Sequence, residues 1–269
     1  MLLMIDHLTL YRYETPARGV VQSHRLMPST CAGQEVVAWE VTVYGGVKGG
    51  GFRDGAGDWV QGWSVTGPVS EIAVQVRGEV ATSDTAGVLR GHRETISPEV
   101  YLVPTAATAL TGALPTLAKA GQGQATILGA AHELSRAVTQ AVAYQPGTTH
   151  AHTTAAEALA LGAGVCQDHA HVLCAVARAN QIPARYVSGY LSSDAQGAGH
   201  EAAHAWAELY IAGLGWVGFD PANACCPDAR YVRLGSGLDS RDAAPIRGSA
   251  RSTGAEWLDV TVAVQAMQQ

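Results

Sequence analysis

The sequence predicts an α+β protein in which an N-terminal antiparallel β-sandwich precedes a core of helices packed on an antiparallel sheet. Over the first 80 or so residues, apolar and polar side chains alternate with a period of two, as in half-buried strands. From residue 127 apolar side chains recur at helical spacing, and after Pro183 the period returns to two. These changes predict an N-terminal domain at 1–100 and a second domain at 101–269.

Composition narrows the class of protein. The chain has 269 residues, of which 47% are hydrophobic and 15% charged, so it can bury a sizeable core. Its 17 basic and 23 acidic residues give a net charge of −6, which argues against a nucleic-acid partner. No apolar run approaches the roughly 18 residues of a membrane span, and the N-terminus lacks the basic segment of a secretion signal. We therefore expect a cytoplasmic protein that binds neither nucleic acid nor membrane.

The sandwich is predicted from three runs in which apolar and polar residues alternate, at 8–13, 37–44 and 72–77. The turn-rich stretch 45–58 contains Asp54-Gly55 and is predicted to connect two strands of a hairpin. Several short strands in succession are typical of a β-sandwich.

Local start and stop signals define the helices of the second half. Apolar residues at helical spacing predict a helix over 127–141. Thr154 and Glu157 match a capping box for a short helix over 155–161, and Gly162 fits its C-terminal stop. Another helix begins near Cys166. Strands follow at 186–191, 204–211, 216–220 and 257–264.

Cys166 is the cysteine whose surroundings suggest chemistry. It follows glycines and opens a helix, where the helix dipole and free N–H groups favour a nucleophilic thiolate and could hold an oxyanion. A buried structural cysteine is the alternative interpretation. The odd number of cysteines argues against a disulfide framework. The absence of a C-x-x-C pair argues against a zinc ribbon. The five are Cys31, Cys166, Cys174, Cys225 and Cys226.

The hairpin over 204–220 places a histidine near a carboxylate. If residue 211 pairs with 215, Asp220 lies opposite Trp206, and His204 is its diagonal neighbour on the same face. Such neighbours lie within about 7 Å at Cβ, so an imidazole–carboxylate hydrogen bond can form, whereas a one-residue slip would separate them. A nucleophile, a base and a group that orients the base are the three parts of a catalytic triad.

Five runs resemble the bacterial transglutaminase-like cysteine enzymes. They are GVCQDHAH at 164–171, IPARYVSGYL at 182–191, HAWAE at 204–208, GWVGFDPAN at 215–223 and RDAAPIRG at 241–248. The N-terminal β-region resembles the sandwich that precedes the core in many members. The resemblance implies a papain/transglutaminase-like core at 101–269 with Cys166 as nucleophile, His204 as general base and acid, and Asp220 as its orienting partner. His169 stands where an aromatic residue is expected.

The implied chemistry acts on a peptide or protein amide. Cys166 would attack the carbonyl, His204 would protonate the leaving amine, and water or a second amine would resolve the thioester. The triad does not distinguish hydrolysis from transamidation; the resemblance favours hydrolysis, because many bacterial members are peptidase-like. Gln167, Asp168 and Trp206 are candidates for the substrate and oxyanion region, with Asp168 alternatively a helix-capping charge. We expect no cofactor and no metal requirement, and the oligomeric state stays open.

Two other functions need weighing. His200, Glu201 and His204 form a literal H-E-x-x-H, which on a helix would bind zinc. However, no histidine follows His204, no glutamate lies between Glu208 and Glu256, and the flanks read as glycine-rich loop and strand. A non-catalytic scaffold with this fold is the other alternative, and it would tolerate Cys166→Ala.

Overall fold

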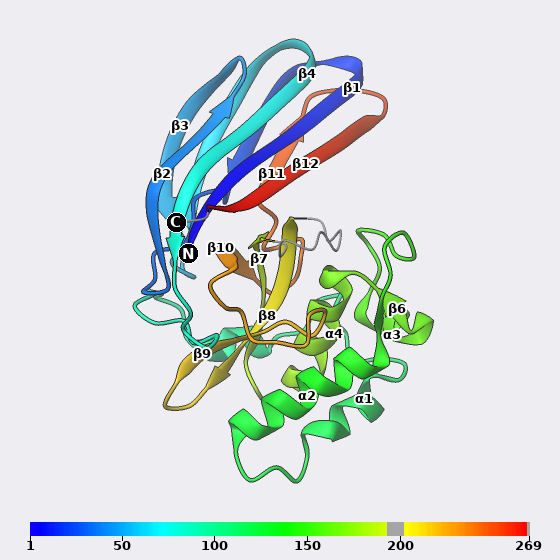
Figure 1. Cartoon of the computed structure of the whole chain (residues 1–269). Coiled ribbons are helices and arrows are strands. Elements are labelled where there is room, and N and C mark those ends of the chain that lie inside the picture. Colours follow the sequence, from blue (N-terminus) through cyan, green and yellow to red (C-terminus); the bar gives the residue numbers. More distant parts are fainter. Residues whose placement is uncertain (193–201, 268–269) are drawn as a thin grey trace.

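The computed structural model of the chain describes residues 1–192 and 202–267, and in it a β-sandwich lies against a core of helices and strands (Figure 1). The predicted α+β fold is confirmed. The sandwich strands are β1 (Leu2–His24), β2 (Gln34–Val43), β3 (Gly46–Arg53), β4 (Trp59–Thr82), β11 (Ile246–Ala250) and β12 (Glu256–Met267). The described helices are too short or too polar to cross a membrane.

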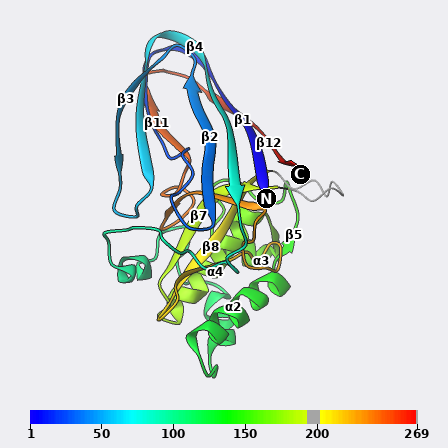
Figure 2. The same ribbon diagram turned by 60° about the vertical axis from the view of Figure 1, so that its left-hand side comes forward.

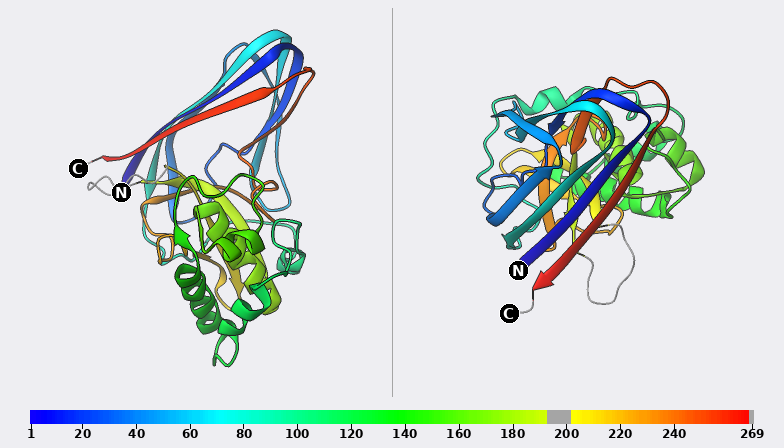
Figure 3. Two further views of the ribbon diagram at one scale, coloured as in Figure 1. Left: turned by 90° about the vertical axis from the view of Figure 1, so that its right-hand side faces the viewer. Right: turned by 90° about the horizontal axis from the view of Figure 1, so that it is seen from above.

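The sandwich is one antiparallel sheet whose two longest strands, β1 and β4, fold over on themselves. β12 and β2 pair with one half of these strands, whereas β11 and β3 pair with the other half. The register of β1 against β4 shifts between Arg12 and Gly19, where the two halves meet. Figure 3 shows the two layers separating from this bend. Apolar side chains from both layers fill the space between them, among them Leu3, Ile5, Val20, Val65 and Val74.

Two features of this sheet differ from what the sequence indicates. β3 lies inside the stretch 45–58 that was predicted as a connection; its side chains are almost all exposed, so no apolar alternation marks it. β11 and β12 come from the C-terminal end of the chain yet pair with β1. The boundary near residue 100 stays a prediction, but the sheet is built from both ends of the chain, because Leu2 of β1 pairs with Met267 of β12 (Figures 1 and 2).

The core contains helices on one side of a four-stranded antiparallel sheet. The helices are α1 (Leu114–Leu117), α2 (Ile127–Ala141), α3 (Ala155–Leu161) and α4 (Cys166–Ala179), with 3-10 turns at Pro98–Leu102 and Ala118–Gly121. The sheet has the order β10-β7-β8-β9, and a short pair, β5 with β6, lies apart from it. These strands are β5 (Ala143–Tyr144), β6 (Ala163–Gly164), β7 (Ala184–Leu191), β8 (Ala203–Ile211), β9 (Gly215–Phe219) and β10 (Tyr231–Gly237).

Local signals in the sequence account for the helix boundaries. The Thr154 hydroxyl accepts from the Glu157 N–H, and the Glu157 carboxylate accepts from the Thr154 N–H, which completes the predicted capping box of α3. Gly162 ends that helix with φ of 66°, a left-handed conformation that glycine adopts without a Cβ penalty. Helix α2 starts and stops where its apolar spacing predicts.

The four-stranded sheet is covered on both faces. Ala205, Ala207 and Leu209 of β8 pack into the helical core, whereas Val232 and Leu234 of β10 belong to the core of the sandwich. Strands β7 and β10 are therefore buried along their whole length. The sandwich therefore covers one face of the four-stranded sheet and is not a separate appendage.

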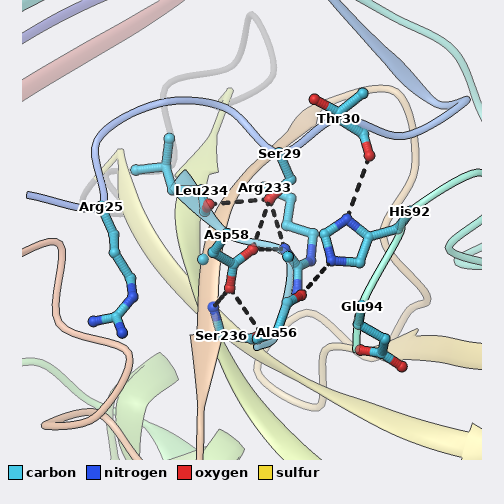
Figure 4. A network of polar contacts seen from close by, with 12 residues as sticks. Arg25, Ser29, Thr30, Ala56, Asp58, His92, Glu94, Arg233, Leu234 and Ser236 are labelled. Carbon is cyan, nitrogen blue, oxygen red and sulfur yellow. Dashed lines mark hydrogen bonds and ion pairs between the residues drawn. The ribbon is translucent and has the colours of Figure 1, made fainter. Parts of the chain in front are cut away.

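A buried charge network joins the sandwich to the core, and Figure 4 shows the part of it around Arg233 and Asp58. Arg233 on β10 binds Asp58, at 2.7 Å, and Glu208 on β8, at 2.9 Å. Arg185 on β7 binds the other oxygen of Glu208 at 2.7 Å and Glu94 at 2.6 Å. Burial alone would raise the pKa of Glu208, but the two guanidinium groups lower it to about 2. Removing one member would leave an uncompensated charge in the interior.

Candidate active site

Cys166 lies at the first position of α4, directly after the short strand β6. Val165 is the N-cap residue, with extended φ and ψ. The thiol is partly exposed and packs at the edge of the helical core. A nucleophile placed there is accessible while its backbone is held by the helix.

Asp168 holds the turn that presents Cys166. Its Oδ2 accepts from the Val165 N–H at 2.8 Å and from the Thr149 hydroxyl at 2.6 Å, and the side chain is buried. A Cβ at Gly164 would lie 2.6 Å from the same oxygen, which explains the glycine. Of the two interpretations of Asp168, the geometry favours the capping charge.

The hairpin of β8 and β9 has the predicted register. Ile211 pairs with Gly215, and the ladder ends at Ala207 with Phe219, so that Asp220 follows directly. The His204 Nε2–H donates to Asp220 Oδ2 at 2.7 Å, and both side chains are buried. Cys166 is the second side-chain partner of the imidazole, and its hydrogen bond raises the pKa of His204.

These contacts set the charge state of His204. Burial lowers its pKa, but the hydrogen bonds to Asp220 and Cys166 and the charges of both partners outweigh burial and raise it to about 10. Burial alone would also raise the pKa of Asp220. Hydrogen bonds from His204, Asn223 and Tyr231 instead hold this pKa below its usual value. The raised pKa of His204 therefore favours the imidazolium form, which lies between the Asp220 carboxylate and Cys166.

Two hydrogen-bond donors to Asp220 were not predicted from the sequence. The Asn223 side chain and the Tyr231 hydroxyl each donate to Asp220 Oδ2 at 2.7 Å. Asn223 stands in the DPAN run, where a turn after the aspartate could have suggested it. Tyr231 starts β10, eleven residues beyond Asp220, and nothing in its local sequence signals the contact.

The remaining predicted residues lie around this centre. Trp206 is buried and stacks on His204, with ring centroids 6.5 Å apart, and its place in the substrate and oxyanion region stays a prediction. Gly189 on β7 makes room for it, because a Cβ there would lie 2.7 Å from the indole. Gln167 is in the first turn of α4, and its amide donates to the Ala151 carbonyl at 3.3 Å. His169 is buried under the turn, and both its ring nitrogens face carbonyl oxygens, of Val165 and Val142.

The structure does not place the described part of the H-E-x-x-H motif on a helix, as a zinc site would require. His200 and Glu201 lie outside the described residues, whereas His204 belongs to a strand and not to a helix. Its Nε2 is engaged by Asp220. A zinc site of this type needs both histidines on one helical face.

Known proteins resemble the chain along its whole length. The model of the transglutaminase-like superfamily matches residues 115–221, and that of the bacterial transglutaminase-like N-terminal region matches residues 3–81. An uncharacterised protein of Mycobacterium leprae is 29% identical across 97% of each chain. One of Mycobacterium tuberculosis is 40% identical over 114 residues, 39% of this chain and 36% of its own.

A solved structure shares the fold. A candidate cysteine protease from Cytophaga hutchinsonii superposes with a TM-score of 0.76 at 20% identity, covering 100% of this chain and 91% of its own. Both halves of the molecule, sandwich and core, thus have counterparts in one other protein. The chain belongs to the transglutaminase-like superfamily, in the group whose core follows a bacterial transglutaminase-like N-terminal region.

Proposed function

We propose that the protein is a cysteine-dependent enzyme that acts on peptide or protein amides through Cys166, His204 and Asp220. The observation that carries the proposal is the continuous hydrogen-bonded series from the thiol at the start of α4, through the imidazole, to a buried carboxylate. These are the three roles of nucleophile, acid–base and orienting group.

The reaction proceeds in two halves. With the proton of the Cys166–His204 pair already on the imidazole, the Cys166 sulfur attacks the amide carbonyl, and the imidazolium then gives that proton to the leaving amine, which leaves a thioester. Water attacks the thioester, His204 takes one of its protons, and the bond to the Cys166 sulfur breaks, which releases the acid and restores the Cys166–His204 pair with its proton on the imidazole. A second amine in place of water would give transamidation. Asp220 keeps the imidazole oriented in both halves.

Hydrolysis is the outcome we favour. The solved protein with the same fold is described as a candidate cysteine protease, and the resemblance of the motifs points the same way. Trapping the thioester with an added primary amine would measure how often an amine replaces water. An excess of transamidated over hydrolysed product would contradict this preference.

The test of the triad is alkylation by iodoacetamide across a pH series, followed by peptide mass spectrometry. We expect Cys166 to label at pH 6 at least about tenfold faster than the other thiols, and His204→Ala to abolish the difference. Cys31, Cys225 and Cys226 are matched controls, because they are also partly exposed and burial raises the pKa of each. If Cys166 labels no faster than these three, the protein is not a thiol enzyme, and the scaffold function takes its place.

A further inference from the structure

The Tyr231 hydroxyl contacts the triad from β10, outside the hairpin and its turn. The side chain is 5% exposed, and its hydroxyl lies 2.7 Å from Asp220 Oδ2, the oxygen that also accepts from His204. Because a carboxylate can only accept, the phenol must donate. A donor to a buried carboxylate is a charge-assisted hydrogen bond, among the stronger polar contacts in proteins.

The hydrogen bonds continue past the phenol. Cys225 Sγ lies 3.3 Å from the Tyr231 oxygen, and since the phenol proton is committed to Asp220, the thiol is the donor of this second bond. The Asp220 N–H donates to the Cys225 carbonyl at 2.8 Å, and the Cys225 N–H to the Asp220 carbonyl at 3.2 Å. Backbone and side chain therefore hold the same three residues together.

Aromatic packing fixes where the phenol can point. The Tyr231 ring meets Trp206 edge to face at 5.5 Å and lies 5.9 Å from the His204 ring. Trp206 itself lies over Gly189, the strand position between β10 and His204 that has no side chain. Tyr231 thus reaches from β10 to Asp220, just past the end of β9, with its ring packed against those of Trp206 and His204.

We infer that Tyr231 is a positioning residue, which sets the orientation of Asp220 and the share of its negative charge that reaches His204. The inference rests on the proposed function of this site. A carboxylate oxygen that accepts from three donors gives each of them a weaker bond than one that accepts from two. With the phenol present, Asp220 holds the imidazolium proton less tightly, and His204 is a better acid toward the leaving amine.

The charged and titratable groups around His204 are few among the described residues. Cys166 faces it from α4, Asp220 from the end of β9 and Tyr231 from β10, with Cys225 behind the phenol. The nearby Asp228 and Arg230 pair with each other at 2.8 Å. A change at Tyr231 is therefore transmitted through Asp220.

The experiment is an NMR titration of the His204 imidazole in the wild-type protein and in Tyr231→Phe. We expect the midpoint in the variant to move to higher pH by about half a unit or more, because Asp220 then has one donor fewer. Tyr190→Phe is the matched control: its buried hydroxyl bonds the His7 ring at 2.7 Å in the sandwich core, away from the triad. It should lower the thermal unfolding midpoint without moving the His204 titration.

Two outcomes would overturn the inference: a His204 midpoint in Tyr231→Phe that equals the wild-type value, or one that moves to lower pH. If Tyr231→Phe does not fold, Cys225→Ala replaces it. This variant removes the thiol that donates to the phenol oxygen, so the His204 midpoint should move in the same direction but by less. An unchanged midpoint in Cys225→Ala would count against the inference. The alkylation series judges the proposed function separately, since the titration of His204 needs no reactivity at Cys166.

Discussion

At the scale of single residues, the site depends on glycines as much as on its polar groups. Gly164 leaves space for the Asp168 carboxylate, and Gly189 leaves space for Trp206 beneath His204. Neither position has a positive φ, so the reason for the glycine is close approach and not backbone conformation. Such constraints are invisible until the neighbouring strand is in place.

Gly189→Ala should therefore be costly. Its Cβ would overlap the Val232 carbonyl oxygen and press on the Trp206 ring, which we expect to destabilise the fold by about 1–3 kcal/mol and to slow Cys166 alkylation. Gly50→Ala, on exposed β3 with no atom within 4 Å of the new Cβ, should change the unfolding free energy by less than about 0.5 kcal/mol. Urea denaturation measures the unfolding free energy of both variants. Equal losses of unfolding free energy would show that close packing at Gly189 does not cause the destabilisation.

The raised pKa of His204 predicts the pH range of the active form. The imidazolium exists below a pH of about 10, so the alkylation rate of Cys166 should change as the pH rises through that value. Asp220→Asn removes a charge that raises the pKa of His204, so this change in rate should occur at lower pH in the variant. A change in rate that stays at the same pH would mean that Asp220 does not control the imidazole.

At the scale of elements, the charge network ties β7, β8 and β10 to the sandwich. Glu208 accepts from both Arg185 and Arg233, and Asp58 accepts from Arg233. Glu208 is on the same face of β8 as His204 and Trp206, so the network and the triad share one strand. Holding β8 against β10 also holds Tyr231 against Asp220.

Glu208→Gln should destabilise the protein by about 3–5 kcal/mol, because two buried guanidinium groups lose their shared carboxylate. The carboxyl pKa falls on folding from an ordinary 4.5 to about 2, so its contribution to stability is complete above pH 4.5 and is lost as the pH falls towards 2. Unfolding free energies measured over that range should fall steeply in the wild type and less steeply in the variant. Arg136→Ala, in an exposed pair with Glu133, is the control and should leave the pH dependence of the unfolding free energy unchanged. If the unfolding free energies of the wild type and Glu208→Gln fall in parallel with pH, Glu208 is not the carboxyl that loses its stabilising charge.

At the scale of the whole molecule, the sandwich and the core share an apolar interface, and we expect them to unfold as one unit. Tyr190, Val232 and Leu234 of the core sheet are buried by the sandwich, whose own sheet is completed by β11 and β12 from the far end of the chain. A fragment of residues 101–245 would expose this apolar face and leave Arg233 without Asp58. We expect the fragment to show no cooperative thermal unfolding by circular dichroism. A sharp transition in the fragment would establish an independent core.

Local sequence determined much of this protein. The helices over 127–141 and 155–161, the start of α4 at Cys166 and the register of the β8–β9 hairpin depend on caps, periodicity and a short turn, all of which lie within a few residues of one another. The order of cysteine, histidine and aspartate follows from the same runs. Only the tertiary structure decided the rest: the return of β11 and β12 to β1, the strand inside 45–58, the burial of Trp206 under His204 and the Tyr231–Asp220 bond. These contacts join elements that are distant in the chain or leave no periodic pattern, so they form only when the strands pair and the two sheets pack.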